Sequence, residues 1–342
     1  MLLPTHDAAV LIGRFQPFHN GHLALLTAAL AAAPLCIVVI GSAFHARSPR
    51  HPFSWQERAE MVCGVLPAAD RARLRFVPVR DHHDDARWAA AVRQGIALHS
   101  GTAPANTLLI GHLKDATTDY LRQFPEFQLR ILPAVPQATA LAARDALFGQ
   151  GVDAAAEWVP ATLVEGLRAW AARPAFAELQ QEWQMLQGYR ATWAVAPYPP
   201  VLVTVDCVVR CGDHVLLIRR GAAPGKGLLA VPGGFMERRE TTRRSALREL
   251  EEETHLDVRD DDLHACLHAT AVFDHPDRSE RGRTITHVHF FDLGERPLPA
   301  VRADDDAASV AWTPIAEIVP QEDHFMDDHF QMLMHFIALP GA

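Results

Sequence analysis

Two groups of residues in this sequence have the types and spacing that phosphate chemistry requires. The first is the string Gly13–His22 (GRFQPFHNGH), which carries two histidines three residues apart. At a helix start, this spacing puts the imidazoles of His19 and His22 on one face, beside free amides and the positive end of the helix dipole. With the guanidinium of Arg14, they would stabilise charge on a transferring phosphoryl group. No Ser, Cys or Asp nucleophile is needed if one substrate phosphate attacks the other directly.

The second group is a run of carboxylates on a predicted helix, Thr242–Thr254. At about 100° per residue, Glu249, Glu252 and Glu253 fall on one arc of the helix. Like charges at this spacing repel one another, and a hard divalent cation would offset the cost. A solvated acidic face is the commoner meaning of such a run.

Two neighbouring features favour a metal site over a solvated face. The pair Gly233-Gly234 stands before the helix, where a tight turn must pass close to another group. Arg248 lies inside the run, placed to hold a carboxylate.

Alternating strands and helices position the first group. Short Val-, Ile- and Leu-rich runs alternate with helical stretches such as 22–33 and 55–66, which predicts a parallel sheet covered on both faces. We expect a doubly wound α/β domain of Rossmann type, with ligands beyond the carboxyl ends of the strands. The predicted strands are 8–15, 35–42, 74–81, 107–115 and 128–135.

The pattern changes after a proline-containing stretch, 189–200, where we place the linker. Beyond it, strands at 201–210, 214–220 and 284–293 surround the acidic helix, and a last helix covers 327–338. This is an α+β layout. The predicted organisation is therefore a domain over 1–188, a linker over 189–200 and a second domain over 201–342.

The bulk composition fits two soluble domains. The chain has 342 residues, 49% hydrophobic, with a net charge of -9, which argues against nucleic acid or a membrane as the main partner. Cys207 and Cys211 are more simply explained by strand packing than by a metal site. Without a signal peptide or a long apolar run, we expect a cytoplasmic location. The sequence gives no oligomeric state.

The first half resembles the nicotinamide-mononucleotide (NMN) adenylyltransferase family, archaeal-like branch. The resemblance runs through GRFQPFHNGH, Gly41-Ser42-Ala43, RHPFS with Glu57-Arg58, and GHLKDATTDYLRQFPEF. It implies transfer of AMP from ATP to NMN, giving NAD, with Mg²⁺ bridging the ATP phosphates. One departure is that Arg144 follows Thr139 by five positions rather than three.

The family pattern implies roles for individual residues. His19 and His22 would bind the ATP phosphates beside Arg14, Asp81 would orient the mononucleotide, and Trp88 would stack on the nicotinamide, its alternative being a core aromatic. The other expected substrate contacts of this domain are Gly13, Phe15, Gly21, Arg47, Lys114, Asp115, Thr139 and Arg144.

The second half resembles the Nudix hydrolases, through the box G-x5-E-x7-R-E-U-x-E-E-x-G-U that begins at Gly234. Its one departure is His255 where glycine is usual, and we expect only a local cost because histidine tolerates left-handed backbone angles. The family implies hydrolysis of a nucleoside diphosphate derivative with Mg²⁺ or Mn²⁺ on Glu249, Glu252 and Glu253. One of these glutamates, or a loop residue, would be the general base.

The loops around the box resemble the Nudix half of bifunctional adenylyltransferase/ADP-ribose pyrophosphatases, which makes ADP-ribose the expected substrate. Two alternatives stay open: a module that senses ADP-ribose without hydrolysing it, and a Nudix half that acts on another nucleoside diphosphate derivative. The expected substrate contacts are Arg219, Arg220, Lys226, Gly233, Gly234, Asp277 and Arg278.

Overall fold

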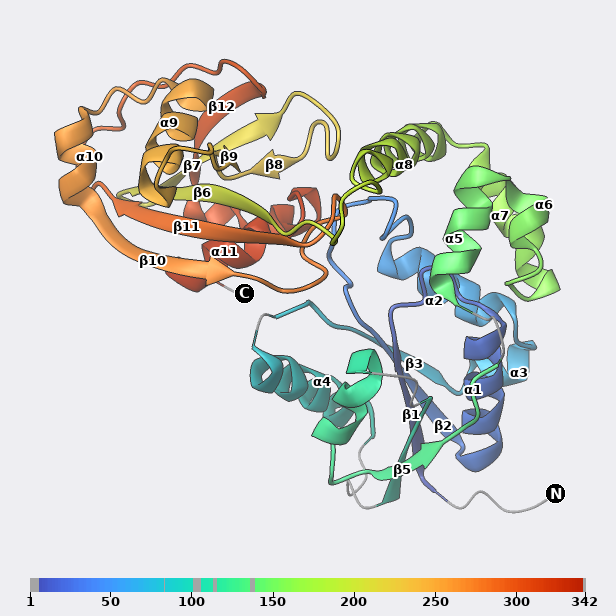
Figure 1. The fold of residues 1–342 in the computed structure, drawn as a ribbon. Coiled ribbons are helices and arrows are strands. Elements are labelled where there is room, and N and C mark those ends of the chain that lie inside the picture. The colour runs from blue at the N-terminus through green and yellow to red at the C-terminus, as the bar shows by residue number, and fades with distance from the viewer. Residues whose placement is uncertain (1–5, 83, 101–105, 113–115, 136–138, 341–342) are drawn as a thin grey trace. The chain divides into compact units, whose positions relative to one another are not determined.

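The computed structural model describes residues 6–82, 84–100, 106–112, 116–135 and 139–340. The chain divides into two compact units, Met1–Trp183 and Gln184–Ala342 (Figure 1). The division falls inside the helix α8 (Pro174–Thr192), so the predicted linker 189–200 begins within a helix. Each unit is described by itself below.

The first unit is built on a parallel sheet. Its described strands follow the order β3-β2-β1-β4-β5, and all four pairings are parallel. This is the predicted doubly wound arrangement, with the chain reversing direction along the sheet at β1. The strands are β1 (Ala8–Gly13), β2 (Leu35–Ile40), β3 (Leu74–Pro78), β4 (Thr107–Gly111) and β5 (Gln128–Ile131).

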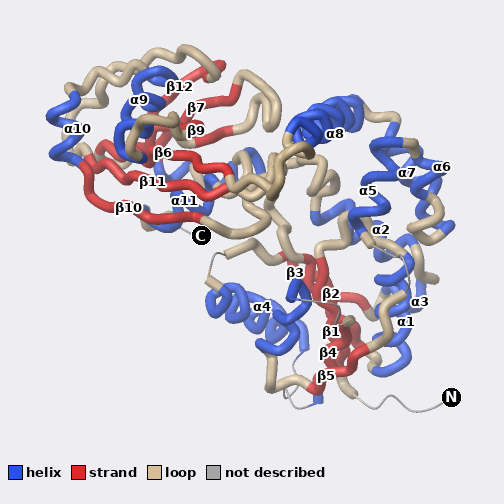
Figure 2. Tube along the Cα trace, viewed as in Figure 1, coloured by secondary structure: helices blue, strands red, loops and turns tan. Residues whose placement is uncertain are grey.

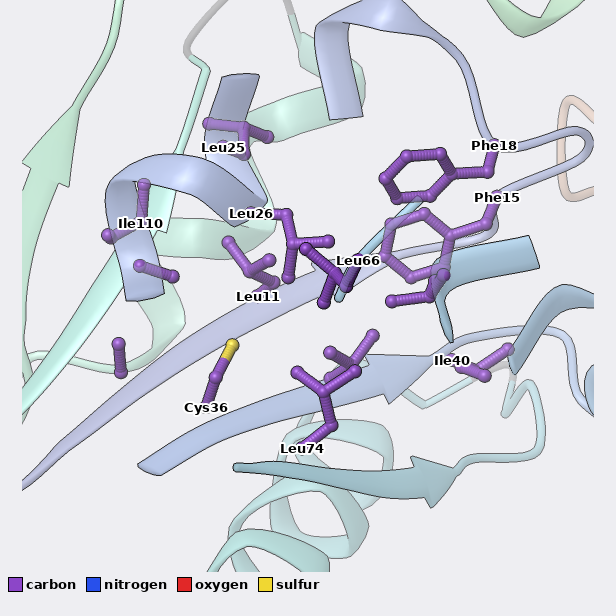
Figure 3. Close-up of a cluster of buried hydrophobic side chains, with 14 of the residues drawn as sticks. Leu11, Phe15, Phe18, Leu25, Leu26, Cys36, Ile40, Leu66, Leu74 and Ile110 are labelled. Atoms are coloured by element: carbon purple, nitrogen blue, oxygen red, sulfur yellow. The ribbon is translucent and has the colours of Figure 1, made fainter. Parts of the chain in front are cut away.

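The two faces of this sheet carry separate apolar cores, because consecutive strand residues point to opposite sides. Leu11, Val38 and Ile110 pack on one face against α1 (Asn20–Ala32) and α2 (Trp55–Gly64). Figure 3 shows this cluster, with Phe15 and Phe18 at the end where β1 stops. Val10 and Val39 face the other side and pack against α4 (Asp85–Ser100).

The rest of the first unit is helical. The segments α3 (Ala68–Arg71) and η2 (Ala116–Gln123) connect strands, and the helical region after β5 packs with Phe53 in a third apolar cluster. That region consists of α5 (Ala140–Gly149), α6 (Val152–Ala155), η3 (Ala161–Leu163), α7 (Val164–Ala171) and the first part of α8.

The second unit contains a mixed sheet. Its main path is β10-β11-β6-β7-β12, with β8 paired to β7 and β9 paired to β6. The pair β6 and β11 is parallel, whereas the others are antiparallel. The strands are β6 (Leu202–Cys211), β7 (His214–Arg220), β8 (Leu229–Ala230), β9 (Gly233–Phe235), β10 (Leu267–Phe273), β11 (Thr284–Asp292) and β12 (Ala307–Pro314).

Helices cover both faces of this sheet (Figure 2). Ala246 and Leu250 of α9 (Thr242–Thr254) pack on Val205, Cys207 and Val209 of β6, as the helical pattern predicts. On the opposite face, Val208 packs with α11 (His329–Phe336). The remaining helices are α10 (Asp260–Cys266), η4 (Ile315–Glu317) and η5 (Val319–His324).

Two further features concern the cysteines of β6 and the helices. Cys207 and Cys211 are buried along β6 without forming a disulfide, consistent with strand packing. In the described ranges, none of the helices has the length and apolar character needed to span a bilayer.

Candidate active sites

His19 and His22 lie together at the start of α1. Nδ1 of His19, the N-cap residue, accepts hydrogen bonds from the backbone N–H groups of Gly21 (3.1 Å) and His22 (3.4 Å). Nδ1 of His22 accepts from the N–H of His19 (3.2 Å), and the two rings stack with centroids 3.6 Å apart. Because each Nδ1 is an acceptor, we assign the proton of each neutral imidazole to Nε2. The pair therefore carries two N–H donors.

The turn between β1 and α1 brings an aromatic ring onto this pair. Phe15 is buried, has a left-handed backbone (φ 50°), and meets the ring of His22 edge-on at 4.7 Å. A Cβ on Gly13 would lie 2.9 Å from the ring of Phe15, so this close packing requires glycine. The residues predicted from the histidine string are thus brought together.

Arg58 holds the loops of this site together, a role that sequence reasoning missed. It is 1% exposed, and its Nη1 donates to the carbonyls of Arg14 (2.6 Å) and Gly41 (2.8 Å). Its Nη2 donates to the carbonyl of Ser42 (2.9 Å), so one side chain links the loops after β1 and β2. Burial lowers the pKa of Arg58 to about 10, which leaves it charged at neutral pH. Its place on the buried face of α2, beside Ala59, was the available signal.

Asp81 lies at the end of β3 in a defined orientation. Its carboxylate accepts hydrogen bonds from Ser42 Oγ (2.6 Å) and His45 Nε2 (3.0 Å). Burial raises the pKa of Asp81, but the hydrogen bonds from His45 and Ser42 outweigh it and hold the pKa well below the usual range. The carboxylate is therefore ionised and positioned next to the loop that Arg58 fixes.

Other residues predicted to contact substrate are held by the protein itself. Arg47 makes a two-pronged ion pair with Glu57 (2.8 and 3.0 Å), and Arg144 Nη1 donates to the carbonyl of Gln16 (2.6 Å). Thr139 caps α5 through Ala142 N–H. The bond from Arg144 holds α5 against the turn after β1. Substrate binding by Arg47, Thr139 and Arg144 stays a prediction. Lys114 and Asp115 lie outside the described residues.

Trp88, the expected nicotinamide contact, is half-buried on α4. Its ring meets Tyr120 and Phe124 edge-on, with centroids 5.6 and 5.9 Å away. It packs against the apolar cluster on that side of the sheet. The core-aromatic alternative therefore describes one side of the ring, and stacking on nicotinamide stays a prediction.

In the second unit, Arg248 organises the carboxylates of α9. Its Nη1 lies 2.7 Å from Glu252 and 3.0 Å from Glu249, and its Nε donates to Glu240 (3.1 Å). The prediction that Arg248 holds a carboxylate is confirmed. The helix ends at His255 in the predicted left-handed conformation (φ 39°), with its N–H bonded to Glu251.

The glycine pair of β9 lies against these carboxylates, as predicted for a turn that passes close to another group. A Cβ on Gly234 would lie 2.5 Å from the carboxylate of Glu249. The N–H of Gly233 donates to Glu253 Oε2 (2.8 Å). Gly234 thus allows the strand to approach the acidic face of α9, whereas a Cβ on Gly233 would meet β6, 2.3 Å from the carbonyl oxygen of Val205.

The donor chemistry of this acidic face suits a divalent cation. Burial raises the pKa of Glu249, and burial together with the charge of Glu249 raises that of Glu253 to about 8, against the Gly233 N–H. A cation bound by these oxygens would offset both penalties. Among the described residues, no three His, Cys, Asp or Glu side chains are grouped to hold a metal as they stand, since Glu249 and Glu252 turn to Arg248. The metal ligands therefore stay a prediction.

The charged residues of the second unit that are predicted to contact substrate differ in their surroundings. Arg278 is buried in an ion pair with Asp328 (2.8 Å), which stabilises the loop before β11 rather than presenting a free cation to substrate. Arg219 and Arg220 bond to the carbonyls of Gly227 and Pro224 in the loop between β7 and β8. Lys226 and Asp277 are exposed. Their contact with substrate stays a prediction.

Comparison with known proteins assigns a family to each half. Residues 10–79 match the cytidylyltransferase-like family model, and residues 200–336 match the NUDIX domain model. A nicotinamide/nicotinic acid mononucleotide adenylyltransferase of Acinetobacter baylyi is 32% identical over 181 residues, 52% of this chain and 94% of that protein. An ADP-ribose pyrophosphatase of Methanocaldococcus jannaschii is 37% identical over 107 residues, 31% of this chain and 57% of that protein.

The solved structures cover both units at once. The bifunctional NMN adenylyltransferase/ADP ribose pyrophosphatase of Francisella tularensis is 31% identical, with a TM-score of 0.89 over 96% of this chain and 98% of that one. A second structure of that enzyme contains AMP and a manganese ion. The two sheets, one of nucleotidyltransferase type and one of Nudix type, define the class of protein. It is a two-domain enzyme that acts on nucleotides. The chain belongs to the family of bifunctional NMN adenylyltransferase/ADP-ribose pyrophosphatases.

Proposed function

We propose that the first unit transfers AMP from ATP to NMN. A phosphate oxygen of NMN attacks the α-phosphorus of ATP, the bond between the α-phosphorus and the bridging oxygen breaks, and NAD and diphosphate form. The observation that carries this proposal is the capped histidine pair, because its backbone contacts leave Nε2–H of His19 and His22 as the hydrogen-bonding groups of the rings. Two neutral donors at a helix N-terminus stabilise the charge that builds on the departing diphosphate.

The other groups of this site position the reactants. Arg58 fixes the carbonyls of the two loops, and Asp81 stays ionised to accept hydrogen bonds from the mononucleotide. Mg²⁺ enters with ATP as part of the substrate. No side chain forms a covalent intermediate.

The second unit hydrolyses ADP-ribose to AMP and ribose 5-phosphate. The oxygen of a water molecule forms a bond to one phosphorus, the P–O–P bridge breaks, and the water protons leave with the two phosphate products or the general base. Mg²⁺ or Mn²⁺, bound by Glu249, Glu252 and Glu253, would polarise the phosphate and make water more acidic. The carrying observation is the buried pair Glu249 and Glu253 packed against Gly233-Gly234, a costly arrangement without a cation.

The experiment that tests both proposals uses the full chain with Mg²⁺. Incubation with NMN and ATP is expected to give NAD and diphosphate, and incubation with ADP-ribose to give AMP and ribose 5-phosphate, both followed by ³¹P NMR. ADP-ribose binding without cleavage would favour the sensing alternative. Cleavage of other nucleoside diphosphate derivatives in preference to ADP-ribose would favour the alternative substrate.

A further inference from the structure

The end of α9 carries a side chain that the Nudix box does not usually place there. His255 stands where glycine is usual, and its backbone is left-handed (φ 39°). Glycine adopts these angles at less cost, so the backbone alone gives no reason for a histidine. The imidazole contacts two carboxylates, with Nε2 2.9 Å from Asp304 Oδ2 and Nδ1 3.3 Å from Glu251 Oε1. The side chain therefore makes contacts that a glycine cap would lack.

The carboxylate of Asp304 is oriented to receive this ring. Its Oδ1 accepts a hydrogen bond from the N–H of Asp305 (2.9 Å), and its Oδ2 accepts one from Nε2–H of His255. Both bonds lower the pKa of Asp304, the bond from His255 most, so the carboxylate is ionised at neutral pH. Asp305 also has a left-handed backbone (φ 52°). Because strained backbone persists only where its surroundings hold it, the contacts of this turn fix its conformation.

The segment 300–306, which contains Asp304, covers the C-terminal end of α9. The last carbonyls of a helix have no partner within the helix itself. Here the carbonyl of Thr254 accepts a hydrogen bond from the N–H of Arg302 (2.8 Å). The carbonyl of Glu253 accepts one from the N–H of Asp304 (3.4 Å). Together with the imidazole contact, these two backbone bonds join the segment to the last turn of the helix.

The other end of the segment 300–306 is fixed to the sheet. The carbonyl of Asp306 accepts a hydrogen bond from the N–H of Gly221 (2.7 Å), directly after β7. A Cβ on Gly221 would lie 2.8 Å from this carbonyl oxygen, so the two backbones are in close contact. The segment therefore links the last turn of α9 to the end of β7, where Arg219 and Arg220 lie.

We propose that His255 is a positioning residue for the divalent cation of the second unit. The inference rests on the proposed hydrolytic function and deepens it, because Glu252 and Glu253 lie in the turn that the segment 300–306 covers. The imidazole holds the segment on this turn, while the N–H of Gly233 holds the carboxylate of Glu253. The cation then meets ligands that are already in place, and its affinity is not reduced by the need to order the turn.

The first test is amide hydrogen exchange of the full chain without metal. In His255→Gly, we expect the amides of Arg302 and Asp304 to exchange about fivefold faster, because one hydrogen bond of the segment is lost. His255→Asn also removes the ring and keeps a residue that tolerates left-handed angles, so it should behave in the same way. Asp304→Ala should match both variants, whereas Asp304→Asn keeps a hydrogen-bonding partner for the ring and should exchange like the parent chain.

The affinity for Mn²⁺ is the second readout, measured by titration of the electron paramagnetic resonance signal of free Mn²⁺ without ADP-ribose. We expect His255→Gly and His255→Asn to weaken Mn²⁺ binding about fivefold and, at saturating Mn²⁺, to leave kcat for ADP-ribose within about twofold of the parent. His324→Asn is the matched control, because His324 is an exposed histidine beside Asp323, and it should change neither value. Unchanged exchange and Mn²⁺ affinity in His255→Gly, or a lower thermal midpoint with unchanged Mn²⁺ affinity, would overturn the proposal.

The positioning role and the hydrolytic function can fail separately, because Mn²⁺ binding requires no turnover. A parent chain that binds Mn²⁺ and leaves ADP-ribose uncleaved would contradict the proposed reaction. Weaker Mn²⁺ binding in His255→Gly would still support the positioning role in that case. Hydrolysis of ADP-ribose with equal Mn²⁺ affinity in the parent and in His255→Gly would contradict the positioning role alone.

Discussion

The two candidate sites are built from opposite kinds of charge. The first places neutral imidazoles and helix amides where β1 meets α1, with the guanidinium of Arg58 bonded to the loop carbonyls of Arg14, Gly41 and Ser42. The second packs carboxylates into a buried position where their pKa values rise. The first is prepared to receive an anion directly, whereas the second needs a cation before it can receive one. The same class of substrate, a nucleotide phosphate, is thus met in two ways by one chain.

The largest effect is expected from Glu252→Gln. Loss of one metal ligand should lower ADP-ribose hydrolysis about a thousandfold and leave NAD formation within about twofold. Glu251→Gln is the matched control, because Glu251 is a neighbouring exposed glutamate that contacts only His255 among the groups described here. The comparison fails if Glu251→Gln is as damaging, or if NAD formation falls with hydrolysis.

The histidine pair can be separated from its capping role. His19→Ala should lower NAD formation about a hundredfold or more and cost about 1 kcal/mol of unfolding free energy. His19→Asn should restore the stability, because asparagine caps helices well, but should not restore the rate. The rate of NAD formation and the thermal midpoint of unfolding are measured for each variant. If His19→Asn recovers the rate as well as the midpoint, His19 acts only as a helix cap.

Arg58→Met tests whether the first site depends on loop positioning. Removal of the buried guanidinium leaves three carbonyls without their donor, and we expect about 3 kcal/mol of destabilisation in the first unit. KM for NMN and kcat for transfer should both worsen, with ADP-ribose hydrolysis unchanged. Arg93→Met, which removes a half-exposed ion pair with Glu126, is the control and should have a small effect. If the two variants behave alike, Arg58 has no special positioning role.

The last expected effect is a pH dependence in which stability falls as the carboxylate site ionises. The folded-state pKa of Glu253, about 8, lies above its unfolded value, so its contribution to stability is complete below about pH 4.5 and is lost as pH rises through 8. Without metal, Glu253 by itself should contribute a loss of about 1 kcal/mol per pH unit within this window, seen as the difference between the parent chain and Glu253→Gln. Glu253→Gln should flatten the dependence of unfolding free energy on pH, and bound Mn²⁺ should reverse the direction of that dependence. If the unfolding free energy of the metal-free second unit rises with pH, and does so equally in Glu253→Gln, the proposed contrast in charge between the two sites is contradicted.

Much of the architecture follows from apolar periodicity. The boundaries of β7 and α9 coincide with the predicted segments, because a continuous buried run and a one-sided helical pattern leave little choice. The strands predicted to end at 15 and 42 end at Gly13 and Ile40, since polar residues after a strand look the same in sequence whether or not they pair. The break inside α8 depends on packing, which the proline stretch at 189–200 does not reveal.

The sites were predictable where the chemistry is local in sequence. The histidine string lies within one segment, and its two imidazoles come together at the start of α1. The acidic helix also forms as predicted, but Glu249 and Glu252 pair with Arg248, and their role as metal ligands stays a prediction. Isolated cations were harder, because the ion pairs of Arg47 with Glu57 and of Arg278 with Asp328 join residues far apart in sequence. Contact of these two arginines with substrate stays a prediction. The positioning role of Arg58 was not predicted, because its partners are backbone carbonyls from two loops and its place among the apolar positions of α2 was the one local signal.

The central claim is that one acidic helix holds a divalent ion while a histidine pair elsewhere meets a triphosphate. Crystals of the full chain grown with Mn²⁺ and a non-hydrolysable ATP analogue test it directly by anomalous diffraction. We expect a manganese peak within coordination distance of Glu249, Glu252 and Glu253, and triphosphate oxygens bonded to Nε2 of His19 and His22. A manganese peak only elsewhere, or a triphosphate bound away from the imidazoles, would contradict the account.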